Sequence, residues 1–148
     1  MRLTLYTDLS LRLLMFLALD PPGQATIQTV ADRYRVSRNH LMKVAQQLGQ
    51  AGFIETVRGR GGGLRLRRPP AEITIGEVVR TTEEDFRMVA CFGDEASCVL
   101  TPACRLRGAL GEALAAYLGT LDRYTLADLT AAGPPMRLAL GLPPAEAA

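Results

Sequence analysis

Three cysteines, Cys91, Cys98 and Cys104, lie within one loop-like stretch and are the only cysteines of the chain. Thiolates bind zinc and iron–sulfur clusters, but a structural zinc site usually pairs cysteines two to four residues apart. Here six and then five residues separate the three cysteines. This wider spacing suits a larger object, and we predict an iron–sulfur cluster whose fourth ligand comes from elsewhere.

Other interpretations of the cysteines stay open on this evidence. An odd number excludes a complete set of disulfides within one chain, and few cysteines without a convincing secretory signal are typical of a reducing cytoplasm. The alternatives are structural or incidental thiols, a zinc site and a bare thiol redox switch.

The two halves of the 148-residue chain differ in charge. Residues 1–70 hold 11 Lys and Arg against 4 Asp and Glu, a net charge of +7. Residues 71–148 hold 6 against 11, a net charge of −5. The front half is therefore suited to a polyanion, whereas the acidic rear half would not sit against DNA.

Apolar periodicity predicts three helices in the front half. Leucines recur at every fourth position of residues 2–19, and Asp-Pro-Pro-Gly at 20–23 ends that helix. Thr26 is expected to cap a second helix reaching about Tyr34, and Ser37 a third over 38–50. The short link between the last two predicts a helix-turn-helix.

The third helix carries the residues expected to read DNA, because the second helix of such a motif lies in the major groove and meets bases with its N-terminal side chains. With Leu41, Val44, Ala45 and Leu48 facing inward, the outward polar residues at that end are Ser37, Arg38, Asn39, His40 and Lys43.

Strand-like runs at 53–57 and 64–68 flank Arg-Gly-Arg-Gly-Gly-Gly, which predicts a hairpin wing with a basic tip. Arg58 and Arg60 are expected to enter a minor groove, while Gly61 and Gly62 let the backbone turn close to phosphates. The combination of wing and helix pair predicts binding to double-stranded DNA.

Behind the wing, Thr74 and Glu77 form a possible capping box that opens a helix through about Arg80. A long helix is predicted from Pro102 to about Tyr124, with a leucine stripe formed by Leu106, Leu110, Leu114, Leu118 and Leu121. The stripe packs either on its own domain or on a partner, and we favour a partner because the winged core is complete without it. Residues 125–129 add a short helix, and repeated Pro-Pro pairs suggest a loose tail.

We therefore expect a mainly α fold with a small β-hairpin wing (α+β), a winged helix-turn-helix plus a long dimerisation helix. The domains are a DNA-binding domain at 1–82, a cysteine-bearing cluster-binding loop at 83–104, a dimerisation helix region at 105–130 and a tail at 131–148. The apolar run at 13–19 is too short to span a bilayer, so we expect a cytoplasmic protein. The single histidine lies in the DNA-reading helix without a nucleophile or paired carboxylates, which argues against an enzyme.

Four features together resemble a known family: Asp8-Leu9 with Arg12, the Ser-Arg-Asn-His-Leu run at 37–41, the glycine-rich wing at 58–63, and the spaced cysteines. They look like the Rrf2 family of winged-helix repressors, and in particular its nitric-oxide sensors, over nearly the whole chain to about Leu129. The resemblance implies a homodimer joined through the long helix, a palindromic operator, and cluster ligation by Cys91, Cys98 and Cys104.

The resemblance also bears on the fourth ligand. One branch of the family takes it from a histidine after the last cysteine, but here Arg105, Leu106 and Arg107 follow. By similarity to the nitric-oxide sensors, Asp8 of the partner subunit fills the position and Arg12, one turn further on, orients its carboxylate. The alternative is a plain ion pair within the helix.

A carboxylate oxygen is a poorer ligand for cluster iron than a thiolate, so nitric oxide is expected to react first at that iron and to release the operator. By the resemblance, [4Fe-4S] is favoured. The sensors often have five residues between the first two cysteines where this chain has six, so [2Fe-2S] stays open. The alternatives are a [2Fe-2S] redox or iron-status regulator of the same fold and, from another class, a small iron–sulfur electron carrier.

Overall fold

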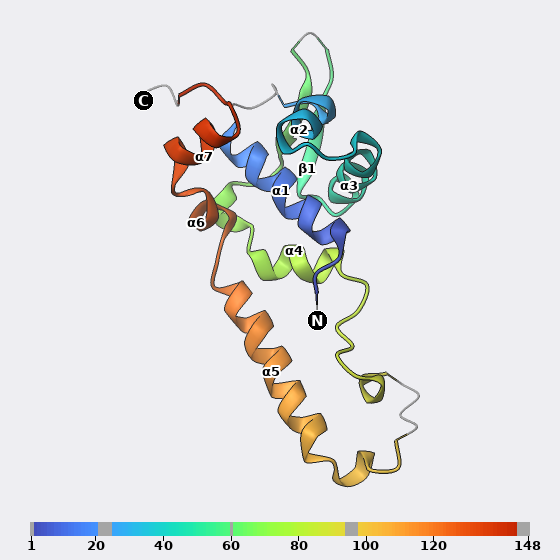
Figure 1. Ribbon diagram of the computed structural model, residues 1–148. Helices are drawn as coiled ribbons and strands as arrows, with labels where there is room; N and C mark the ends of the chain where they lie inside the picture. Colours follow the sequence, from blue (N-terminus) through green and yellow to red (C-terminus); the bar gives the residue numbers. More distant parts are fainter. Residues whose placement is uncertain (1, 21–24, 60, 94–97, 145–148) are drawn as a thin grey trace.

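The computed structural model describes residues 2–20, 25–59, 61–93 and 98–144 (Figure 1). The front half contains α1 (Leu5–Leu19), α2 (Ile27–Tyr34), α3 (Arg38–Gln50), β1 (Ile54–Val57) and β2 (Gly63–Leu66). The rear half contains α4 (Ile75–Thr82), α5 (Arg105–Asp122), α6 (Leu126–Thr130) and α7 (Gly133–Ala139). Short 3₁₀ turns lie at Pro70–Glu72, Ala90–Phe92 and Thr101–Ala103. This confirms the predicted fold class, mainly α with a two-stranded antiparallel wing.

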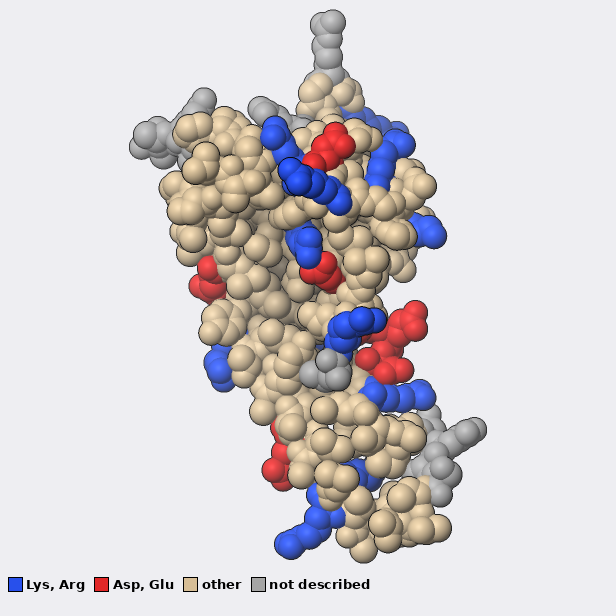
Figure 2. Space-filling view, viewed as in Figure 1, with Lys and Arg blue, Asp and Glu red and all other residues tan. Residues whose placement is uncertain are grey.

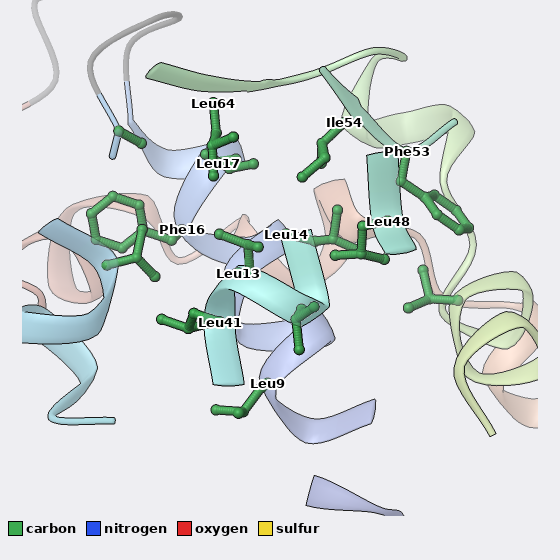
Figure 3. Packing of buried hydrophobic residues seen from close by; sticks show 14 of the residues in the cluster. Leu9, Leu13, Leu14, Phe16, Leu17, Leu41, Leu48, Phe53, Ile54 and Leu64 are labelled. Carbon is green, nitrogen blue, oxygen red and sulfur yellow. The ribbon is translucent and has the colours of Figure 1, made fainter. Parts of the chain in front are cut away.

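Helix α1 forms the centre of the core and packs against α3, α4 and α6. Apolar side chains along it are buried and point toward the surrounding elements, as Figure 3 shows for Leu9, Leu13, Leu14, Phe16 and Leu17, whereas Leu5 in the first turn is 59% exposed. Each fully buried side chain of this size contributes about 2 kcal/mol of transfer free energy. The buried face of α1 is thus the surface against which the DNA-binding elements pack.

The caps of the helix-turn-helix lie where the sequence predicts them. The hydroxyl of Thr26 accepts from the backbone N–H of Thr29 at 3.1 Å, and the hydroxyl of Ser37 accepts from that of His40 at 3.5 Å. Between α2 and α3, Arg35 adopts a left-handed conformation with φ 55°. This residue turns the chain so that α3 starts in a new direction on the surface.

The wing is a hairpin in which Ile54 pairs with Leu66 and Val57 with Gly63. Leu64 of β2 is buried against the core and also forms a bridge with Ala25, where its N–H donates to the Ala25 carbonyl at 2.7 Å. The wing is therefore attached to the segment that precedes α2, which fixes it relative to the helix-turn-helix.

The junction between α4, α5 and α6 is made by backbone and side-chain contacts. The N–H of Ile75 donates to the carbonyl of Tyr124 at 2.8 Å, and the N–H of Leu126 to that of Ile73 at 2.8 Å. Arg80 of α4 donates to both carboxylate oxygens of Asp122 at 2.5 and 2.8 Å, and these hydrogen bonds lower the pKa of Asp122. The C-terminal end of α5 is thereby held on α4.

Only half of the predicted capping box at α4 forms. The hydroxyl of Thr74 accepts from the Glu77 N–H at 3.2 Å, but the Glu77 carboxylate pairs with Arg68 at 2.7 Å. Glu77 thus forms an ion pair with Arg68, just after the wing, instead of a hydrogen bond to the backbone N–H of Thr74.

Two predicted boundaries in the rear half are wrong. The long helix begins at Arg105 instead of Pro102, because Pro102 lies in a separate 3₁₀ turn and Cys104 has extended backbone angles. The loose tail is replaced over 133–139 by α7, in which the Pro-Pro pair occupies the first turn. Proline is tolerated there because the first backbone N–H groups of a helix have no intrahelical partner.

Candidate nucleic-acid interface and metal centre

The N-terminal end of α3 presents an exposed polar surface. Arg38, Asn39, His40 and Lys43 are all exposed, while Leu41 and Val44 on the opposite side are buried. Ser37 caps this end, where the unpaired backbone N–H groups and the helix dipole attract anions. Figure 2 shows Lys and Arg side chains around the base of the wing and on the side of the molecule where α3 lies.

The wing tip depends on glycine. Gly59 and Gly61 have φ of 104° and 79°, and the N–H of Gly62 donates to the Gly59 carbonyl at 2.9 Å. A Cβ atom on Gly62 would overlap the Val57 carbonyl, so no larger residue fits without a shift of the turn. Arg58 is exposed at this tip, whereas the predicted minor-groove residue Arg60 lies outside the described residues.

Asp8 and Arg12 form the expected pair on α1. Arg12 donates from Nε to Asp8 Oδ1 at 3.1 Å and lies 3.0 Å from Oδ2 through Nη2, with both side chains more than 40% exposed (44% and 43%). The Arg12 guanidinium also lies over the ring of Tyr34, 5.9 Å from its centroid. The Asp8 carboxylate is thus accessible to a second chain while one side of it is held by Arg12.

The three cysteines lie on the segment that joins α4 to α5, and all are free thiols. Cys91 lies in the 3₁₀ turn at Ala90–Phe92 and is half-buried, Cys98 is exposed, and Cys104 is half-buried at the start of α5. Within the described part of the chain, no three His, Cys, Asp or Glu side chains are grouped so that they could hold a metal ion. The donor set fits an iron–sulfur cluster chemically, since cysteine thiolates are the usual ligands of such clusters and none of the three cysteines is in a disulfide.

A pocket of about 740 Å³ lies beside Cys104. Phe86 and Phe92 form part of its apolar lining, and Arg87, Arg105 and Arg107 bring positive charge. Arg107 also donates from Nε to the carbonyl of Cys91 at 3.2 Å, which links the first cysteine to α5. A cationic, partly apolar surrounding is suited to an anionic group held by thiolates.

Sequence reasoning missed one contact between the cysteine segment and α1. Glu83, at the end of α4, accepts from the backbone N–H of Thr4 at 2.8 Å and from its hydroxyl at 3.1 Å. Thr4 is the N-cap of α1. No local pattern could have indicated this contact, because 79 residues separate the two partners.

The fold and these surfaces define a winged helix-turn-helix DNA-binding regulator. The sequence matches the Rrf2 family, described as an iron-dependent transcriptional regulator, over residues 3–132. The chain therefore belongs to the Rrf2 family, which confirms the resemblance. Members of this family are transcriptional regulators and not enzymes, as the sequence also indicated.

Relatives include the HTH-type transcriptional regulator NsrR of Bacillus subtilis, 56% identical over 131 residues that cover 87% of this chain and 90% of the relative. The NsrR of Geobacillus kaustophilus is 54% identical over 87% of this chain and 89% of its own length. These similarities confirm that the likeness extends to proteins named NsrR.

Solved structures agree on the fold. T. potens IscR superposes with a TM-score of 0.74 at 20% identity, covering 93% of this chain and 91% of that one. CymR of B. subtilis, the global cysteine regulator, superposes with a TM-score of 0.65 at 26% identity, covering 89% and 98%. None of the helices described in this chain is both long and apolar enough to cross a membrane.

Proposed function

We propose that this chain is an iron–sulfur cluster-dependent repressor that binds a palindromic operator as a homodimer and releases it in response to nitric oxide. The observation that carries the proposal is the set of three free cysteines on the segment between α4 and α5. The NsrR relatives support the regulatory role. Such a regulator acts where its DNA is, in the cytoplasm.

Each predicted part has a role in this proposal. Residues 1–82 bind DNA through the α3 residues and the wing, 83–104 hold the cluster, and 105–130 form the dimer contact. Cys91, Cys98 and Cys104 provide three thiolates, and Asp8 of the partner subunit provides the fourth ligand. We favour [4Fe-4S], in which each of four irons takes one protein ligand.

The exposed surface of α5 supports the homodimer. No residue of this 18-residue helix is buried, and Leu106 at its start is 65% exposed. Leu110, Leu114, Leu118 and Leu121 are only partly covered. In Figure 1 the helix extends away from the DNA-binding elements. An apolar stripe left accessible in this way is expected to pack against a second copy.

The residues of the chain would transmit the signal as follows. When bound, the cluster supplies iron atoms with which nitric oxide reacts. Asp8 is the weakest of the four ligands because its oxygen is harder than a thiolate sulfur. Loss of the Asp8 contact would break a tie between the two subunits. The two α3 helices would then leave the spacing that matches the half-sites of the operator.

The test is an iron and acid-labile sulfide assay with an absorption spectrum of the anaerobically purified protein, followed by nitric-oxide titration with operator DNA present. We expect a cluster that nitric oxide bleaches together with loss of DNA binding. Cys98→Ala should lose the cluster, whereas the control Val99→Ala, at a neighbouring side chain that is 92% exposed, should retain it.

Other outcomes select other functions. Zinc or no metal in the wild-type protein would leave a thiol-switched or simple winged-helix repressor. A [2Fe-2S] spectrum, with DNA affinity that responds to oxidation but not to nitric oxide, would select the redox or iron-status regulator. Failure to bind any duplex DNA would favour the alternative function of a small electron carrier.

A further inference from the structure

The last described residues, 133–144, extend beyond the family match, which ends at residue 132. They contain α7 and a short segment that returns to the DNA-binding half. Helix α7 packs on α1 (Figure 1), and Gly141, after α7, lies close to the Arg33 side chain of α2. The apolar residues Leu140 and Leu142 pack against the main core. Residues 133–144 therefore pack as part of the folded domain.

Arg137 attaches α7 to the end of α1. Its side chain is buried, with 7% exposure, and its guanidinium donates to the carbonyl of Leu19 through Nη1 and to that of Pro143 through Nε, the latter at 2.7 Å. Leu19 is the last residue of α1, a helix with no basic residue in its own last turn. The carbonyls at a helix C-terminus lack intrahelical donors and carry partial negative charge, so a cation is well placed there.

The positive charge of the buried Arg137 side chain is compensated by hydrogen bonds. A buried charge is costly unless hydrogen bonds compensate it, and Arg137 finds two carbonyl oxygens. Burial raises the pKa of the neighbouring Asp20, and the charge of Arg137 offsets part of this rise. The guanidinium thus lies in a partly desolvated site where its contacts are strong.

The segment also contacts α2. Gly141 has φ 61°, and a Cβ atom on it would overlap the guanidinium of Arg33. The N–H of Leu142 donates back to the Arg137 carbonyl at 2.8 Å, which closes the turn. A larger residue at 141 would be strained because of its positive φ, and the Arg33 side chain would have to move to make room for it.

We propose that residues 133–144 are a C-terminal strap and that Arg137 is a positioning residue that sets the orientation of the helix-turn-helix relative to α5. The strap follows α5 and α6 along the chain and binds the end of α1 and the side of α2. At its C-terminal end, α5 is also attached to α4 by the Arg80–Asp122 pair and by the backbone hydrogen bonds of the α4–α5–α6 junction. Two separate attachments restrict rotation about either one, and so fix the distance between the recognition helices of a dimer. This proposal rests on the proposed homodimer.

The test compares Arg137→Met, which retains side-chain length without donors, with Leu138→Ala at the next residue, which is 81% exposed. Binding is measured to an operator with the preferred half-site spacing and to operators with the spacing changed by one and two base pairs. Arg137→Met should lose about fivefold or more of the spacing preference, while the Leu138→Ala control keeps it. Backbone hydrogen exchange at the end of α1 and in α2 should increase in Arg137→Met only.

Gly141→Ala should loosen the other end of the strap. It provides a second test if Arg137→Met does not fold. It should reproduce both effects with Arg137 intact. Unchanged spacing preference in a folded variant with faster exchange would overturn the proposal, since the strap would then be local packing alone. If the wild-type protein shows no spacing preference, the proposed binding of a dimer to a palindromic operator is wrong. If hydrogen exchange in α1 and α2 is unchanged in Arg137→Met, the proposed strap is wrong whatever the state of the dimer.

Discussion

At the scale of single residues, the Asp8 carboxylate combines two properties that a fourth cluster ligand requires. Arg12 donates to Oδ1 and approaches Oδ2, which holds the group in one orientation. A carboxylate has about four lone-pair sites, so oxygen lone pairs remain for a metal after Arg12 has bound. Because both side chains are well exposed, the ion pair alone contributes little to stability. The main effect of the Asp8–Arg12 pair is therefore to orient the Asp8 carboxylate.

The replacement Asp8→Ala tests this ligand. In the proposed site, the cluster should remain bound through the cysteines, but the amount of nitric oxide needed to bleach it should change, because the iron that Asp8 would hold acquires a different ligand. The measurement is the absorption titration used for the wild-type protein. Asp32→Ala, at an exposed carboxylate on α2, is the control. A titration identical to that of the wild-type protein would remove Asp8 from the mechanism.

At the scale of elements, the join between α4 and α5 depends on the absence of a side chain. Gly76 of α4 is buried, and a Cβ atom there would overlap the Asp122 carboxylate and lie 2.8 Å from Nη1 of Arg80. The glycine therefore makes room for the ion pair that joins the two helices. At Gly49 of α3, by contrast, a Cβ atom would make only an ordinary contact, at 3.9 Å from the Ile54 carbonyl.

Gly76→Ala should therefore destabilise the protein by about 1–3 kcal/mol, because the Arg80–Asp122 pair must move or separate. Gly49→Ala, the matched control within a helix, should stabilise it by about 0.5–1 kcal/mol through the helix propensity of alanine. Urea unfolding followed by circular dichroism measures both changes. Equal effects of the two substitutions would show that the close fit at residue 76 has no energetic consequence.

At the scale of the whole molecule, the chain separates its charge and its apolar surface. The basic front half carries α3 and the wing, while the acidic rear half carries α5 with its partly exposed leucines. This arrangement directs one end toward DNA and, in the proposed homodimer, leaves the other for a second copy. The cysteine segment joins the two parts along the chain and lies beside the N-terminal end of α5 (Figure 1).

Leu114→Glu places a charge in the middle of the leucine stripe and should weaken the dimer. We expect the dissociation constant of the dimer to rise about 100-fold or more, since a charge buried in an apolar interface costs at least about 2.7 kcal/mol. Sedimentation equilibrium measures the change. Ala116→Glu, at an exposed position of the same helix outside the stripe, should leave the dimer intact. A dimer of normal affinity in Leu114→Glu would place the subunit contact elsewhere.

Local spacing in the sequence determined α1 to α4, the wing and the exposed N-terminal residues of α3. From Leu9 on, the leucine repeat predicts the buried face of α1, and the hydroxyls of Thr26 and Ser37 mark the starts of α2 and α3. Such features depend on residues within one or two turns of each other, so the sequence displays them directly. The three cysteines belong to the same class of local signal.

The tertiary structure alone decided which distant groups meet. Arg80 pairs with Asp122, 42 residues away, and Arg137 reaches Leu19 across 118 residues. Glu77 pairs with Arg68 instead of completing its capping box. Each contact depends on how the elements pack in three dimensions. Local periodicity carries no information on that packing, and for this reason the sequence indicated a loose tail where the folded chain has α7.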